Sequence, residues 1–175
     1  MRWLLALVLT FSSLPAVAES QFYGEFQLGV HGVQHSELDF YPGFASGSVG
    51  MYVRPRIGVE LFYDRATSTG RDDDFDVEVN EASGIAARFE SPAQIGLQAY
   101  ILLGYVTYSI NQYENLATPR RLAKENFTGA RISLGLAKTL QRYRQVQFVF
   151  EYRNYDVDAP LRVDGFGLGL RVKLQ

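Results

Sequence analysis

Apolar residues alternate strictly with small or charged ones at the end of the chain. From Gly165 to Leu174 every second residue is apolar, beginning with Phe166, and the residues between are glycine, arginine or lysine. Successive side chains of a strand point to opposite faces, so this run has one apolar face and one small or charged face. Its length matches the roughly 9–11 residues with which a tilted strand crosses a bilayer. The pattern predicts a membrane-spanning β-strand.

Seven earlier segments repeat this alternation. With the last one, the expected strands cover residues 22–31, 46–54, 56–65, 84–90, 94–109, 129–140, 145–155 and 165–174. Their connections are tight at Pro55, Ser91-Pro92 and 141–144, long at 33–45, 66–83 and 110–128, and shorter again around 156–162. A barrel with short periplasmic turns and long extracellular loops has this order, and an even strand number puts both termini in the periplasm. We predict an all-β fold: an eight-stranded antiparallel up-and-down transmembrane β-barrel.

The first 18 residues have the pattern of a secretory signal peptide. Arg2 supplies a positive start, residues 3–11 are apolar, and Ala16-Val17-Ala18 forms a small-residue cleavage site. The apolar run is too short for a membrane-spanning helix, which needs about 20 residues. We expect cleavage near Ala18 and a single barrel domain over residues 19–175.

The charge of the exported part argues against one class of partner. The whole chain has 17 basic and 19 acidic residues, so removal of Arg2 leaves 16 against 19 and a net charge of −3. A nucleic-acid-binding domain would carry a basic surface. We therefore expect no nucleic-acid partner. There is also no cysteine, so disulfides cannot hold the exported chain.

Charged residues recur on the face opposite the apolar one, which we assign to the barrel interior. They are the acids Glu25, Glu60, Asp64, Glu90 and Glu151 and the bases Arg54, Arg88, Arg131, Arg153, Arg171 and Lys173. An eight-stranded barrel has an interior just wide enough for side chains to fill, and charges buried there must pair. We predict a structural network that plugs the lumen rather than an ion pathway. Its expected members are Glu25, Glu60, Arg88, Arg131, Glu151, Arg153 and Arg171.

The arrangement resembles the small eight-stranded outer-membrane β-barrels that include the OmpA transmembrane domain. The resemblance covers nearly all of residues 19–175 and rests on Phe22-Tyr23-Gly24, Gly58-Val59-Glu60-Leu61, the stretch from Tyr100 to Tyr105, and Gly167-Leu168-Gly169-Leu170. It implies a monomer in the outer membrane of a Gram-negative bacterium, inserted by the barrel-insertion machinery and surrounded by outer-membrane lipids and lipopolysaccharide. The chain departs from many members in ending Lys173-Leu174-Gln175, where they have the aromatic residue that this machinery reads.

Two histidines are candidates for chemistry, because some barrels of this size are lipid A-modifying enzymes. His31 is expected on the interior face at the end of a strand, and His35 in the first loop beside Ser36 and Glu37. A hydrolase needs its histidine within hydrogen-bond reach of a nucleophile, whereas neighbours in an extended chain point to opposite faces. No His-x-Ser pattern lies on an expected strand. We predict no catalytic, cofactor or metal site.

Two expected loops are strongly charged. Asp72, Asp74 and Asp76 have the opening spacing of a calcium loop, but Val77 and Ser83 stand where its glycine and its closing glutamate belong. A solvated acidic loop is the better interpretation, with weak divalent-ion binding among lipopolysaccharide phosphates as the alternative. In the third loop Arg120, Arg121 and Lys124 could contact such phosphates or the acidic loop, although a solvated loop is again the simpler reading.

Tyrosines gather near the ends of the expected strands. They are Tyr63, Tyr105, Tyr108, Tyr113, Tyr143, Tyr152 and Tyr155. A tyrosine at a membrane interface keeps its ring among the acyl chains and its hydroxyl in water, which produces the aromatic girdles of these barrels. We predict a girdle, with a carbohydrate-binding platform as the alternative.

These observations favour a small, porin-like outer-membrane protein with a structural or surface-interaction role through its extracellular loops, in contact with an extracellular or host surface. The alternatives are a lipid A-modifying barrel enzyme, a narrow pore and a soluble lipocalin-like carrier. A carrier would turn the apolar residues inward and leave rows of glycine outside, whereas interior glycine makes room in a narrow lumen.

Overall fold

The computed structural model describes residues 21–35, 38–68, 70–72, 75–114, 120–157 and 161–174. The expected signal peptide lies outside these residues. The strands are β1 (Phe22–His35), β2 (Leu38–Phe40), β3 (Gly43–Arg54), β4 (Ile57–Ala66), β5 (Gly70–Asp72), β6 (Phe75–Glu90), β7 (Leu97–Glu114), β8 (Arg120–Thr139), β9 (Val146–Val157) and β10 (Leu161–Leu174). Within the described ranges, no helix has the length and apolar content to cross a membrane.

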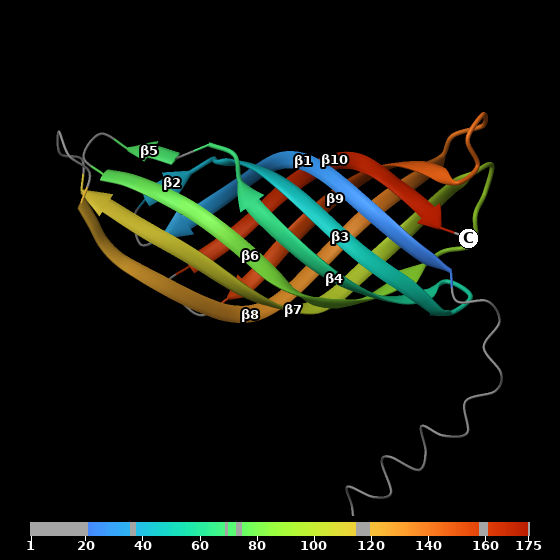
Figure 1. Cartoon of the computed structure of the whole chain (residues 1–175), viewed down its shortest axis with the longest axis horizontal. Coiled ribbons are helices and arrows are strands. Elements are labelled where there is room, and N and C mark those ends of the chain that lie inside the picture. The colour runs from blue at the N-terminus through green and yellow to red at the C-terminus, as the bar shows by residue number, and fades with distance from the viewer. Residues whose placement is uncertain are drawn as a thin grey trace, which may run out of the picture.

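The eight long strands form a closed antiparallel barrel (Figure 1). Each pairs with its neighbours in the order β1, β3, β4, β6, β7, β8, β9, β10, and β10 pairs back with β1 from Phe22 opposite Leu174 to His35 opposite Leu161. The two short strands add to this wall, β2 against β1 and β5 against β6. The predicted fold class is confirmed, because each of the eight expected segments lies on one of the long strands.

The strands extend beyond the expected boundaries at the end that carries the long connections. β6 begins at Phe75, and β7 and β8 pair from the periplasmic turn out to Glu114 opposite Arg120 (Figure 1). Much of the expected loops 66–83 and 110–128 is therefore strand. The reason is that period-two alternation reports contact with lipid on one face, and it disappears once both faces meet water although backbone pairing continues.

Tight turns close the opposite end of the barrel. Ile95 and Gly96 have φ angles of 53° and 73°, and Gln94 and Leu97 exchange backbone hydrogen bonds of 2.9 Å around them. Two central residues with positive φ match the twist of a hairpin, which is why β7 begins at Leu97 rather than at Gln94. The turn between β3 and β4 places Arg56 at φ 69° and shifts the register beside Arg54. Arg54 is consequently exposed, and its assignment to the interior was wrong.

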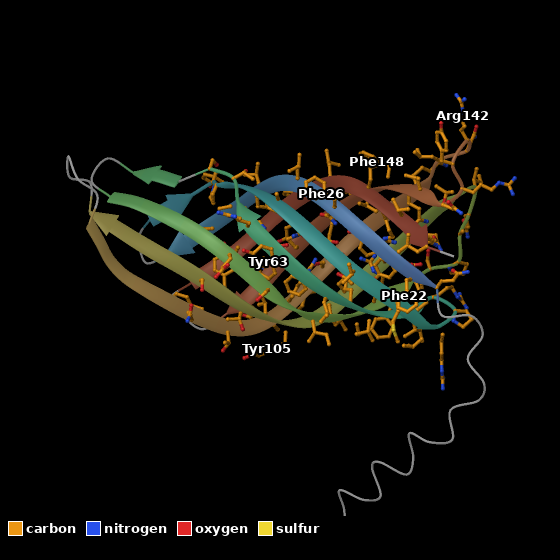
Figure 2. The ribbon with its side chains drawn as sticks, viewed as in Figure 1. Phe22, Phe26, Tyr63, Tyr105, Arg142 and Phe148 are labelled. Carbon is orange, nitrogen blue, oxygen red and sulfur yellow. The ribbon has the colours of Figure 1, made fainter. Side chains whose placement is uncertain are left out.

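The two faces of the wall have opposite character. Phe26 and Leu168 on the outer face are 55% and 51% exposed, whereas Arg88 and Glu151 on the inner face are completely buried. Figure 2 shows Phe26 and Phe148 projecting outward from the ribbon. A surface so apolar requires lipid around it, and the inward turn of the charged residues agrees with the predicted faces.

The tyrosine girdle is only partly as expected. Tyr63, Tyr105 and Tyr143 are exposed on the outside. Tyr108 and Tyr155 instead point inward and are each 1% exposed, so their assignment to the girdle was wrong. A position near a strand end does not decide which face a side chain joins, since that depends on the strand's phase. The side chain of Tyr113 lies outside the described part of the structure.

Candidate functional site: the charged interior

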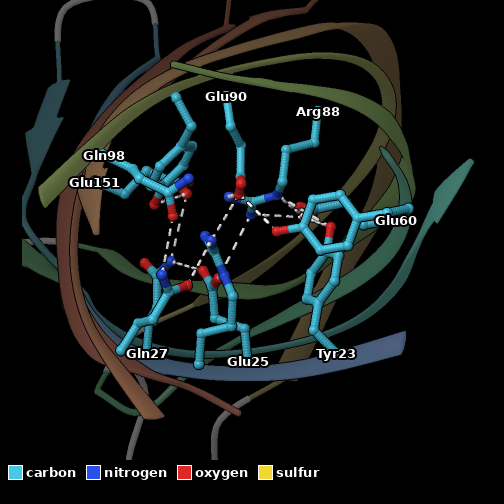
Figure 3. A network of polar contacts seen from close by, with 12 residues as sticks. Tyr23, Glu25, Gln27, Glu60, Arg88, Glu90, Gln98 and Glu151 are labelled. Atoms are coloured by element: carbon cyan, nitrogen blue, oxygen red, sulfur yellow. Dashed lines mark hydrogen bonds and ion pairs between the residues drawn. The ribbon is translucent and has the colours of Figure 1, made fainter. Parts of the chain in front are cut away.

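A continuous set of polar side chains crosses the barrel lumen (Figure 3). It includes the acids Glu25, Glu60, Asp64, Glu90 and Glu151, the bases Arg88, Arg131, Arg153 and Arg171, and the neutral side chains Tyr23, Gln27, Ser46 and Tyr100. These residues come from all eight long strands, so the network ties together segments far apart in sequence. We refer to these thirteen residues as the interior network.

One half of the interior network is organised by Arg88 and Arg171. Arg88 Nη2 lies 2.7 Å from a Glu60 oxygen, which also accepts a 2.8 Å hydrogen bond from the Tyr23 hydroxyl. Arg171 Nε lies 2.6 Å from Glu25, and its Nη1 lies 2.9 Å from Glu90. Hydrogen bonds between ionised partners at these distances are among the stronger ones in proteins.

The other half is organised by Glu151 and Asp64. Glu151 accepts from Arg131 Nη2 at 2.7 Å and lies 3.1 Å from Arg153 Nη2. Arg153 Nη1 donates to Asp64 at 3.0 Å. Asp64 also accepts hydrogen bonds from the hydroxyls of Tyr155 and Ser46. Each carboxylate therefore has several donors, which a buried charge needs to offset its lost hydration.

Gln27 and Arg131 connect the two halves. The Gln27 amide donates to Glu25 and, at 3.3 Å, to Glu151, so it bridges two acids that belong to different halves. Its own Oε1 accepts from Arg153 Nη2 at 2.6 Å. Arg131 Nη1 comes within 3.9 Å of Glu60. As a result, no acid–base pair of the network is isolated from the rest.

Aromatic rings fill the space between the charges. The guanidinium carbon of Arg88 lies 4.2 Å from the centre of the Tyr100 ring, that of Arg131 lies 4.0 Å from Phe62, and that of Arg153 lies 4.6 Å from Phe44. A guanidinium stacks favourably on such a ring face. Toward the extracellular ends of the strands lies a buried apolar cluster of Val33, Phe62, Ala82, Val106, Tyr108, Tyr155 and Val163. The lumen is therefore filled with side chains where the network lies.

Glycines on the inner face make room for the largest of these rings. A Cβ atom at Gly50 would overlap the Tyr23 ring, and one at Gly135 would overlap the Tyr100 ring. Both tyrosines donate to carboxylates of the interior network, Tyr23 to Glu60 and Tyr100 to Glu151 at 3.0 Å. The small residues that alternate along the strands thus give the network its space.

Comparison with known proteins places this barrel in a family. Residues 4–173 match the model of the outer membrane protein beta-barrel domain. The chain belongs to this family. No curated protein sequence matches it significantly.

Solved structures share the fold of this outer-membrane barrel. Ail, the attachment invasion locus protein of Yersinia pestis, crystallised with the heparin analogue sucrose octasulfate, matches with a TM-score of 0.63 and 12% identity over 90% of this chain and 100% of Ail. Neisserial surface protein A matches with 0.61 and 16% identity over 87% and 97% of the two chains. OprG from Pseudomonas aeruginosa matches with 0.58 and 11% identity over 91% and 98%. The family match and the shared fold make the protein an outer-membrane β-barrel, as expected.

The structure places all seven predicted site residues of the barrel inside the lumen and brings them into contact. Glu25, Glu60, Arg88, Arg131, Glu151, Arg153 and Arg171 are all buried. Lys173 is only partly buried, and its Nζ lies 5.5 Å from the Tyr52 ring. Sequence analysis missed the neutral partners Tyr23, Gln27 and Tyr100. Their phase gives their face, but their partners lie across the barrel on strands that are not sequence neighbours.

Of the two candidate histidines, His31 lies on the interior face as expected, whereas His35 does not lie in a loop. His31 is buried, its ring centre 3.9 Å from that of Phe44, and its Nε2 has no hydrogen-bond partner among the described residues. His35 ends β1 rather than standing in a loop, and its side chain is outside the described part. The hydroxyl of Ser46, which lies opposite Gln27 in the register of β1 and β3, donates to Asp64. Among the described residues, no nucleophile lies within hydrogen-bond reach of His31 Nε2.

The two charged loops also differ from expectation. Gly70–Asp72 form β5 and pair with β6, which begins at Phe75, so the acidic segment is largely a hairpin. Residues 73–74 lie outside the described part. The bases Arg120, Arg121 and Lys124 belong to β8, so their assignment to a loop was wrong. The reason is the same as for the extended strands, because outside the membrane a polar sequence no longer distinguishes strand from loop.

Proposed function

We propose that this outer-membrane barrel has a structural and surface-interaction role, with its lumen closed by the interior network. The observation that carries the proposal is the set of four arginines and five acids whose ion pairs join residues of different strands inside the barrel. A water-filled pore needs free space along the axis, whereas here rings and paired charges occupy it.

The network would also hold the strands in one arrangement. Membrane barrels lack a dry apolar core of the soluble kind, because their apolar side chains face lipid. Ion pairs across the lumen would instead hold the strands in position relative to one another. A buried pair is not strongly stabilising relative to apolar residues, but loss of one partner costs about 3–5 kcal/mol, so the network would specify a single arrangement.

The extracellular end supports a surface role. β6, β7 and β8 are the longest strands and extend beyond their neighbours at the end of the barrel that carries the long connections (Figure 1). The fold is shared with an attachment protein and a surface protein. We also propose that residues 1–18 are a signal peptide removed on export, and that the barrel functions as a monomer without catalytic activity.

Planar-bilayer recording tests the closed lumen. The refolded protein, whose folded state is checked by its different gel mobility before and after boiling, should give no large, steady channels at concentrations at which a reconstituted porin conducts. Large channels of uniform size would replace the proposal with a pore.

A further inference from the structure

A polar hollow lies on the outside of the barrel near its extracellular end. It has a volume of about 440 Å³ and lies over β1, β9 and β10. Its polar and aromatic lining consists of Gly32, Gln34, Tyr41, Asn154, Arg162 and Asp164. The buried residues Val33 and Val163 complete the lining. None of the lining residues belongs to the interior network, because the polar ones on β1, β9 and β10 lie on the outer face and Tyr41 lies between β2 and β3.

The strand register shows where this hollow lies relative to the apolar residues of the outer face. Val30, Phe166 and Tyr152 lie opposite one another on β1, β10 and β9 and form the last row of the apolar band. Gly32, Asp164 and Asn154 form the next outward row. Two residues along a strand span about 6.6 Å. On β1, β9 and β10 the hollow therefore begins immediately beyond the last apolar residue of the outer face, on the extracellular side.

The row of residues next to the hollow, which contains Phe166, presents exposed aromatic rings that suit contact with hydrocarbon chains. The Phe166 ring lies 6.0 Å from that of Phe150 and 5.1 Å from that of Tyr152, and Phe166 is more than half exposed. Aromatic rings at this depth contact both acyl chains and headgroups. A ligand in the hollow would thus have its apolar part against this row.

The lining groups have the chemistry of a sugar site. Tyr41 presents a ring that is 72% exposed, and Asp164 and Asn154 offer oxygens and an amide beside it. A Cβ atom at Gly32 would lie 2.8 Å from Asp164 Oδ1 and 3.6 Å from Tyr41 Cε1, so the absence of a side chain leaves the floor open. A flat ring packs on the apolar face of a sugar while amides and carboxylates bind its hydroxyls. Arg162 adds a guanidinium, which suits a phosphate.

We propose that this hollow binds the phosphorylated sugar headgroup of an outer-leaflet glycolipid of the lipopolysaccharide class. Arg162 takes the phosphate, Tyr41 and Asp164 take the sugar, and the acyl chains lie on Phe166 and the row below. A soluble anionic glycan offers the same sugar chemistry, but the continuity of the hollow with the apolar band favours a lipid. The site goes beyond the proposed function and does not depend on a closed lumen, because it lies outside the wall.

Native mass spectrometry of the refolded protein in detergent tests the site. The probe is purified lipopolysaccharide, compared with the same material after deacylation and with a sulfated glycosaminoglycan. Arg162→Gln removes the guanidinium, and Gly32→Leu fills the floor. Arg65→Gln is the matched control, because Arg65 is an exposed arginine on the outer face of β4, beyond the exposed Tyr63, and does not line the hollow. Heat-dependent gel mobility shows that each variant is folded.

The wild-type protein should form a one-to-one lipopolysaccharide complex. Since a hydrogen bond to a charged group contributes about 1.5–3 kcal/mol, Arg162→Gln should weaken this complex about tenfold or more. Gly32→Leu should weaken it comparably, and Arg65→Gln should not. Equal losses in Arg162→Gln and Arg65→Gln would show general charge attraction and overturn the site. Binding of the deacylated sugar or the glycosaminoglycan as tightly as the intact lipid would assign the hollow to a soluble glycan instead.

Discussion

The inner and outer faces of this barrel are specified in different ways. On the outer face, Leu168 and Phe148 are exposed toward the surroundings of the barrel, and another apolar residue in either place would meet the same surroundings. On the inner face, Glu151 has its own set of donors in Arg131, Arg153, Tyr100 and Gln27. A strand is therefore constrained by residue class on one side and by residue identity on the other. The two faces should respond differently to mutation.

The largest effect is expected from removal of a central acid. Glu151→Ala leaves the guanidinium of Arg131 without its closest carboxylate and deprives Arg153 of one of its two, so unfolding in detergent micelles should become easier by about 3–5 kcal/mol. Asp156→Ala, on the same strand but exposed, is the control and should change stability by no more than about 0.5 kcal/mol. Urea titrations of both variants give the comparison. Equal stabilities would mean that the inner face does not depend on its pairs.

A charge on the lipid face should have the next largest effect. Leu168→Arg places a guanidinium in the apolar band and should destabilise the barrel by about 2–4 kcal/mol if the residue lies near the midplane. Leu168→Ile retains the residue class and should leave stability close to that of the wild type. Refolding into lipid vesicles followed by denaturant titration measures both. If isoleucine were as harmful as arginine, the outer face would also require particular residues.

Loss of space inside the barrel should cost less. Gly135→Ala pushes against the Tyr100 ring, and such overpacking costs about 1–3 kcal/mol. Gly47→Ala adds the same methyl group on the outer face, where nothing lies within 4 Å of the new atom. We expect that variant to be as stable as the wild type. Because the two variants add the same methyl group, they differ only in the face that receives it. Identical changes in melting temperature would contradict the claim that the inner face is the tightly packed one.

The smallest effect concerns one hydrogen bond. Tyr100→Phe keeps the ring over Arg88 and removes the 3.0 Å hydrogen bond to Glu151, which should cost about 1–2 kcal/mol. Tyr105→Phe, on the outer face of the same strand, should cost almost nothing. A loss in Tyr105→Phe that matched the one in Tyr100→Phe would place the important hydroxyl outside the lumen.

The sequence alone predicted the features that depend on the alternation of apolar and polar residues along each strand. Lipid contact imposes a period of two on each membrane-spanning segment, so the eight strands, their faces and the inward direction of residues such as Arg88 and Glu60 could be read directly. Where a strand leaves the lipid, the alternation of apolar and polar residues ends as well. This is why the outer halves of β7 and β8 were taken for a loop.

The partners inside the lumen could not be predicted in this way. Gln27 contacts Glu151, and Arg153 contacts Asp64, across strands separated by long stretches of sequence. Those contacts depend on the stagger between strands around the barrel. The alternation of residues within one strand gives no information about that stagger. Tyr155 is a different case, because the phase of its strand gives the inner face and only its position near a strand end suggested the girdle.

A double-mutant cycle on Arg131 and Glu151 tests most directly whether the interior charges depend on one another. Arg131→Met and Glu151→Leu should each destabilise the barrel by about 3–5 kcal/mol, because each leaves a buried charge without its closest partner. In the double variant Arg153 keeps Asp64 and Glu60 keeps Arg88, so much of the loss should be recovered. We predict a coupling free energy of about 2–3 kcal/mol. Losses that add to within about 0.5 kcal/mol would contradict the account, since independent charges cannot form a network that closes the lumen.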